Sequence, residues 1–213
     1  MERYTMRKDV EYRSGGFYCH DKHVWLWPVN DKGAWDWMCM EPHLPSEVVR
    51  HVKERSGCII AGAHAGFYTK QYAHEFSKVL AFEPHPANFA CLVDNVEEAN
   101  VTKLQLILSD KAQFYGLKSD DPQNSGGYYV VEGNSYLSTT IDNICSSHIG
   151  LIHLDVEGHE LEVLIGGSET IDRFSPTIVL ENTYPKYPLA ERFLLDMGYR
   201  VAERLRFDSI FVR

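Results

Sequence analysis

The chain has 213 residues, a formal net charge of −9 and 44% hydrophobic residues. This length is enough for one domain with a sizeable hydrophobic core, and the composition is that of an ordinary globular protein. The negative charge argues against a general affinity for nucleic acids, because binding to phosphate depends on clustered Lys and Arg. No apolar stretch reaches the roughly 20 residues that a membrane-spanning helix needs, so no membrane association is expected.

The five cysteines are scattered along the chain, which does not fit a framework of disulfide bonds. The first residues also lack the apolar core of a secretory signal. We therefore expect a reducing, cytoplasmic setting. The sequence does not indicate an oligomeric state.

Residues 1–45 are rich in aromatic side chains. We interpret them as an N-terminal extension that packs on the rest of the chain and arches over a functional site. Residues 46–213 contain no linker, repeat or low-complexity segment, so they are expected to form a single domain.

The predicted elements alternate between strands and helices, and the last two strands are too close together for a helix between them. In chain order they are a helix at 47–55, strand 58–61, helix 67–76, strand 79–83, a helix from Pro86, strand 104–108, strand 128–131, strand 149–155, helix 160–165, strand 177–181, helix 189–197, and strands 199–203 and 207–212. This alternation predicts an α/β fold with a mostly parallel sheet, helices on both faces and a terminal antiparallel pair. Residues 115–137 interrupt this rhythm: the turn-forming residues 120–127 predict a loop, and the short strand at 128–131 follows it.

The turn from Gly62 to Gly66 follows an apolar strand and opens a helix, and the next strand ends on Glu83. This pattern is typical of a nucleotide-binding unit, in which the turn backbone approaches the ligand and the acid holds ribose hydroxyls. The Gly-x-x-x-Gly spacing differs from the Gly-x-Gly-x-x-Gly fingerprint of dinucleotide sites. It suits S-adenosylmethionine, which has no pyrophosphate to bind.

Several further segments resemble the FkbM-type methyltransferases over roughly residues 57–183. The most specific run is Asp155-Val156-Glu157-Gly158-His159-Glu160-Leu161-Glu162-Val163-Leu164, and the other matches are Gly62, Ala63 and Gly66 in the first turn, Phe82-Glu83-Pro84, Asn88, Asn95, Thr140-Ile141-Asp142 and Pro176 to Glu181. The resemblance implies a class I, Rossmann-like methyltransferase sheet. It also implies that the chain transfers a methyl group from S-adenosylmethionine to an acceptor. The expected target is a hydroxyl of a sugar, nucleotide or small metabolite.

The chain departs from the family pattern at three positions. Ile60 replaces an acid that orders the turn or meets the methionine amino group, His64 replaces an Asn, and His153 replaces a Lys. In lacking the acid the chain resembles some phage-encoded members, for which the location would be the host cytoplasm. We interpret the change as a variant of an active enzyme.

The resemblance and the strand-end rule together assign roles to individual residues. The expected cofactor-binding residues are Gly62, Ala63, His64, Gly66, Glu83, Pro84, Ser109, Asp110 and Asp155, with Glu83 on the ribose and Ser109-Asp110 near adenine. The expected catalytic residues are Asp155 at the methyl-transfer centre, Glu157, and His64 as a base. Structural alternatives remain open, since Glu83 can cap a helix, Asp110 can form a turn, Glu157 can stabilise a helix N-terminus and His64 can merely pack. His159 and Glu160 are expected on the helix surface.

Two further sets of residues complete the predicted site. Asp155, Glu181 and Asn182 suggest a magnesium site, since metal-dependent O-methyltransferases use an acid after the fourth strand and an acid-Asn pair after the fifth, and oxygen ligands suit this ion. Trp35, Trp37, Asn124 and Gly126 are expected to contact the methyl acceptor, a small molecule or glycan. The acceptor pocket should lie over Asp155.

Two other functions remain possible for such a fold. One is a nicotinamide-dependent oxidoreductase, which would require the phosphate-binding glycine fingerprint that this turn lacks. The other is a non-catalytic module that binds S-adenosylmethionine or a partner. Calorimetry with the candidate cofactors separates these functions.

Overall fold

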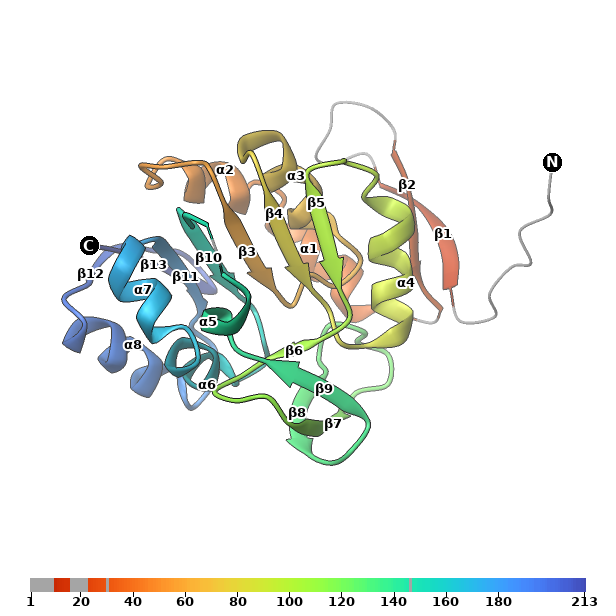
Figure 1. Ribbon diagram of the computed structural model, residues 1–213. Helices are drawn as coiled ribbons and strands as arrows, with labels where there is room; N and C mark the ends of the chain where they lie inside the picture. The colour runs from red at the N-terminus through yellow and green to blue at the C-terminus, as the bar shows by residue number, and fades with distance from the viewer. Residues whose placement is uncertain (1–9, 16–22, 30, 146) are drawn as a thin grey trace.

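The computed structural model describes residues 10–15, 23–29, 31–145 and 147–213, and Figure 1 shows how its elements are arranged. The elements are β1 (Val10–Gly15), β2 (His23–Pro28), α1 (Gly33–Met40), α2 (Leu44–Val49), β3 (Cys58–Ala61), α3 (Phe67–Glu75), β4 (Val79–Phe82), α4 (Pro86–Asn95), β5 (Val101–Leu104), β6 (Ile107–Leu108), β7 (Phe114–Lys118), β8 (Tyr129–Glu132), β9 (Tyr136–Thr139), α5 (Ile141–Ile144), β10 (Leu151–Leu154), α6 (Glu160–Ile165), α7 (Ser168–Phe174), β11 (Thr177–Glu181), α8 (Tyr187–Asp196), β12 (Arg200–Arg204) and β13 (Asp208–Val212).

The main sheet has the strand order β12-β13-β11-β10-β3-β4-β5. β11, β10, β3, β4 and β5 pair in parallel, whereas β13 pairs antiparallel with both β11 and β12. This arrangement confirms the predicted α/β sheet with a terminal antiparallel pair. The carboxyl ends of the parallel strands meet at one edge, where Figure 1 also places the small sheet β6-β9-β7-β8.

Alternate side chains of the central strands enter two hydrophobic cores, one on each face of the sheet. Ile59, Ile152 and Ile178 pack with residues of α6, α7 and α8. Ile60, Val79 and Val179 pack with residues of α2, α3 and α4. Strands buried on both faces read as continuous apolar runs, which is why their positions could be predicted from the sequence.

The N-terminal residues form a β1-β2 hairpin, and β2 packs against α4 (Figure 1). Asn95 fixes this contact, because its side chain accepts a hydrogen bond from the backbone N–H of Leu26 and donates one to the Leu26 carbonyl, both at 2.8 Å. The predicted extension at 1–45 falls partly on residues 1–9, 16–22 and 30, which lie outside the described part of the chain.

Several predicted boundaries were wrong. The first helix after the extension, α2, runs from Leu44 to Val49 and not from 47 to 55, because Pro45 occupies its first turn and the chain turns at Arg50. The third parallel strand is β5, which ends at Leu104, whereas 107–108 form β6 of the small sheet. The predicted strand at 128–131 is confirmed as β8, shifted by one residue, whereas β7 and β9 were missed because their partly exposed residues carry too little apolar periodicity to distinguish them from a loop.

Three helices, α1, α5 and α7, were missed entirely. Among the described residues, no helix has the length and apolarity that crossing a bilayer requires.

Candidate active site

A cavity of about 400 Å³ lies at the carboxyl ends of the parallel strands. Its walls come from the turn after β3, the end of β4, the segments after β10 and β11, the start of β13, α1 and the loop at 124–126. The cavity is therefore where a ligand is expected in an open α/β sheet.

The glycine turn is held close to the end of β10. Gly62 has a φ of +81°, and a Cβ added there would lie 1.7 Å from the backbone oxygen of Asp155. Only glycine fits this position, since both the backbone conformation and the space exclude a side chain. Gly62 and Ala63 also donate backbone hydrogen bonds to the carbonyl of Phe82, both at 3.0 Å. The turn thus presents its backbone to the cavity next to Asp155.

Glu83 lies at the centre of this wall and is almost fully buried. Its carboxylate oxygens accept hydrogen bonds from the backbone N–H of His64 at 2.9 Å and of His85 at 2.8 Å. Burial raises the pKa of Glu83 to about 7, although these hydrogen bonds act in the opposite direction. Each oxygen keeps a further lone pair that can accept a ligand hydroxyl.

His64 connects the glycine turn to the loop at 124–126. Its Nε2 lies 2.7 Å from Oγ of Ser125, and its ring packs against Trp27 with centroids 4.8 Å apart. The backbone at His64 has a φ of +48°, which is uncommon for a residue other than glycine and occurs often at functional sites. Burial lowers the pKa of His64, so its imidazole is neutral near pH 7.

Asp31 ties three separate segments together, and the sequence analysis missed it. Its carboxylate accepts hydrogen bonds from Nε1 of Trp27 at 2.7 Å, from the backbone N–H of Trp35 at 3.0 Å and from that of Ser125 at 2.6 Å. Burial works against its ionisation, but these bonds outweigh burial and hold the pKa of Asp31 below its ordinary value. The network fixes the N-terminal residues and the 124–126 loop over the glycine turn.

We expect Asp31→Asn to destabilise the protein by about 1.5–3 kcal/mol, the range for losing a hydrogen bond to a charged group. The Asn side chain has one acceptor oxygen, so it can accept fewer of the three hydrogen bonds. Its NH₂ group would face the remaining N–H donors. Chemical denaturation measures the change. Asp94→Asn, at an exposed site on α4, is the control, and equal stability of the two variants would contradict the role given to Asp31.

Carboxyl groups gather at the opposite side of the cavity, in a set that we call the acidic cluster: Asp155, Glu157, Glu181 and Asp208. The first three each place an oxygen within 4.8 Å of the others. Asp208 lies directly opposite Glu181 in the β11-β13 ladder. Burial raises the pKa of all four groups, and the charge of Asp155 raises the pKa of the other three further.

The cluster makes stability depend on pH. Between about pH 4 and pH 9 the folded protein keeps protons on groups such as Glu157 and Glu181, whose pKa is raised to about 9, while the unfolded chain has released them. The free energy of unfolding of the ligand-free protein should therefore fall as the pH rises through this window. At pH 8, Glu181→Gln should raise the melting temperature by about 2–4 °C. A scan that shows a lower melting temperature for this variant would contradict the assignment.

The predicted magnesium ligands are only partly brought together. Asn182 does not line the cavity, because its Nδ2 lies 3.3 Å from Oγ of Ser209. Glu157 takes its place beside Asp155 and Glu181, and these three carboxylates are the described residues that offer the right chemistry for a metal ion.

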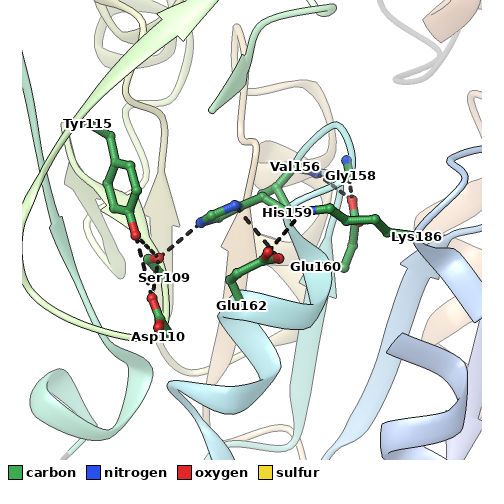
Figure 2. A network of polar contacts seen from close by, with 9 residues as sticks. All are labelled: Ser109, Asp110, Tyr115, Val156, Gly158, His159, Glu160, Glu162 and Lys186. Carbon is green, nitrogen blue, oxygen red and sulfur yellow. Dashed lines mark hydrogen bonds and ion pairs between the residues drawn. The ribbon is translucent and has the colours of Figure 1, made fainter. Parts of the chain in front are cut away.

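Ser109 and Asp110, expected near adenine, do not line the cavity. Ser109 is fully buried, and its hydroxyl lies 2.9 Å from Nε2 of His159 and 3.0 Å from the Tyr115 hydroxyl (Figure 2). They follow β6 of the small sheet, because the third parallel strand ends earlier than predicted. Ile107 and Leu108 line the cavity in their place.

His159 and Glu160 are buried, and the expectation that they lie on the helix surface was wrong. His159 lines the cavity and joins α6 to Ser109, as Figure 2 shows. Glu160 accepts the backbone N–H of Gly158 at 3.1 Å. This bond holds the turn after β10, in which Glu157 has a φ of +56°. Both residues therefore support the segment that carries Asp155 and Glu157.

Three of the four residues expected at the acceptor line the cavity: Trp37, Asn124 and Gly126. Trp37 is half exposed, and its ring packs edge-to-face on Phe207 with centroids 4.8 Å apart. Trp35 instead packs edge-to-face against Trp27 at 5.0 Å. The cavity therefore extends from Glu83 past Asp155 to an aromatic wall.

Comparison with solved structures supports the same fold. A methyltransferase FkbM from Methylobacillus flagellatus KT superposes with a TM-score of 0.52 at 18% identity, covering 82% of this chain and 50% of that one. A Streptococcus mutans protein solved in complex with SAH gives 0.50 at 11% identity, covering 85% and 98%. A ribosomal-protein methylase from Lactobacillus delbrueckii subsp. bulgaricus gives 0.50 at 9% identity, covering 83% and 79%. The chain thus spans half the length of the Methylobacillus protein, and identities this low show the fold alone.

A search of curated proteins found no match to the chain. The family model described as the methyltransferase FkbM domain matches residues 61–201, which contain the glycine turn, Glu83, Asp155 and Glu181. The chain therefore belongs to the FkbM methyltransferase domain family.

Proposed function

We propose that this protein transfers a methyl group from S-adenosylmethionine to a hydroxyl oxygen of a small molecule or glycan. One observation carries the proposal: the glycine turn, Glu83 and Asp155 line the same cavity, at the edge of the sheet where such folds bind ligands. Family membership supports the reaction class, and the arrangement of the cavity supports the assignment of each residue.

The cofactor end of the cavity is the turn and Glu83. The backbone of Gly62 and Ala63 would approach the methionine part, and Glu83 would accept hydrogen bonds from the ribose hydroxyls. Pro84 also lines this wall. Ile60 leaves no acid before the turn, so the methionine part would rest on the backbone of the turn and of Asp155, which lies against Gly62.

Bound S-adenosylmethionine supplies a methyl group activated by the neighbouring sulfonium. The protein has to place the acceptor oxygen in line with that carbon and receive the proton that the oxygen loses. Asp155 lies at the end of its strand, next to the glycine turn, and is part of the acidic cluster. Its raised pKa makes it a better proton acceptor than an ordinary Asp. Asp155 would accept the proton of the acceptor hydroxyl as its oxygen takes the methyl group from the sulfonium.

The lining of the cavity narrows the acceptor class. Among the described residues that line it there are several carboxyl groups and no Lys or Arg. A nucleotide or another phosphate ester would meet uncompensated negative charge there, which is unfavourable in a buried site. This favours a glycan or a metabolite without phosphate groups over a nucleotide.

Isothermal titration calorimetry with S-adenosylmethionine, S-adenosylhomocysteine, NAD and NADP tests the proposal against the oxidoreductase and the non-catalytic module. We expect saturable binding of the first two and no binding of the nicotinamide cofactors. A methyl-transfer screen over glycans and small metabolites then separates an enzyme from a binding module. Selective binding of NAD or NADP would overturn the proposal.

A further inference from the structure

We propose that the acidic cluster binds an ammonium group on the methyl acceptor, so that the substrate is an amino sugar or amino alcohol. This inference rests on the proposed function and names the substrate class for the same site. It concerns recognition, and the methylated atom remains a hydroxyl oxygen.

The first observation is the carboxyl group of Asp208. It is 5% exposed and lines the cavity, yet no hydrogen bond or ion pair joins it to any side chain of the described residues. A buried carboxyl without a partner is costly, and folded proteins retain such groups where a ligand completes them. Asp208 begins β13 opposite Glu181, so its side chain belongs to the same end of the cavity as Asp155 and Glu181.

The second observation is that two further members of the cluster have hydroxyl partners but no cationic one. The hydroxyl of Tyr184 donates to Glu157, and that of Thr183 donates to Glu181. These bonds fix the directions of the two carboxyl groups without supplying a positive charge. Since no Lys or Arg of the described chain lines the cavity, the cation that would let these groups ionise at neutral pH has to come from a ligand.

The third observation is the aromatic wall around the cluster. Trp37, Tyr68, Tyr184 and Phe207 line the cavity together with the four acids. Aromatic faces attract organic cations, and a combination of rings and carboxylates is the usual setting for an ammonium group. The cavity of about 400 Å³ also has room for a substrate beside the cofactor.

A divalent metal ion is the competing occupant of the cluster. A small hard cation needs oxygen ligands or water on all sides. In this structure Asn182 is directed to Ser209, and one oxygen of each of Glu157 and Glu181 already accepts a hydroxyl donor. These contacts favour an ammonium group over a metal ion as the occupant of the cluster. Binding of a metal ion is one outcome of the test.

The test uses matched pairs of probes, glucosamine against glucose and ethanolamine against ethylene glycol. Each is titrated calorimetrically at neutral pH into the full chain saturated with S-adenosylhomocysteine. For at least one pair we expect the amine to bind ten or more times more tightly than its neutral partner. Asp208→Asn should abolish that preference while S-adenosylhomocysteine affinity stays within a few-fold. Asp94→Asn, which changes an exposed site on α4, should behave as the wild type.

The outcomes separate this inference from the proposed function. Equal binding of amine and neutral probe in both pairs overturns the inference, while binding of S-adenosylhomocysteine leaves the proposed function intact. Binding of MgCl₂ that is lost in Glu181→Gln, without any preference for amines, also overturns it and identifies a metal site. If Asp208→Asn fails to fold, Glu181→Gln replaces it and should likewise lose the preference for amines.

Discussion

Asp155→Asn is expected to lower methyl transfer about a hundredfold or more, the lower range for a positioned acid–base group. The substitution keeps the shape of the side chain and removes its ability to accept a proton. Because Asp155 is buried beside other carboxyl groups that raise its pKa, removing its charge should leave the melting temperature unchanged or slightly higher. Affinity for S-adenosylmethionine should stay within a few-fold.

The pH dependence of the reaction gives an independent check on Asp155. Its pKa is raised to about 7, first by burial and then by the charge of Glu160. A base has to be deprotonated to act, so kcat should rise with pH through this region, and Asp155→Asn should remove that limb of the profile. A variant with full activity would remove Asp155 from the mechanism, and an unfolded variant would show a structural role instead.

Glu83→Ala should weaken the binding of S-adenosylmethionine by about 1.5–3 kcal/mol, the scale of hydrogen bonds to a charged group. In the wild type the Glu83 carboxylate would accept hydrogen bonds from the ribose hydroxyls. The backbone N–H groups of His64 and His85 hold this carboxylate in place. The dissociation constant is measured by calorimetry on the folded variant. Glu97→Ala, at an exposed position, is the control.

A second variant separates binding from scaffolding at Glu83. Glu83→Gln keeps an oxygen for one backbone N–H but loses the charge, so its affinity should fall between those of the wild type and Glu83→Ala. Unaltered affinity in both variants would exclude Glu83 from the cofactor site.

The sequence was sufficient for the parts of the fold in which local pattern and burial agree. β3 and β11 have the predicted bounds because each is an apolar run between turn signals. The helix α6 was placed correctly by the run that follows Asp155. In the small sheet β8 was predicted, but β7 and β9 were missed because their residues are partly exposed and the turn-forming residues nearby indicate a loop.

The cavity-lining residues at the strand ends could be predicted from the sequence, as could Trp37, Asn124 and Gly126. Glu83 and Asp155 end their strands, and the cavity brings both together. Asp31 and Asp208 could not be predicted, since their importance depends on contacts with residues far away in the chain, such as Ser125 and Glu181. Asp208 begins an antiparallel strand, and it reaches the carboxyl edge of the sheet only because that strand runs in reverse.

A crystal structure with S-adenosylhomocysteine tests the placement of the cofactor directly. We expect the ribose hydroxyls within hydrogen-bonding distance of the Glu83 carboxylate and the sulfur facing Asp155. A ligand bound outside this cavity, or one with its ribose away from Glu83 and its adenosine over Asp208, would contradict the proposed mechanism.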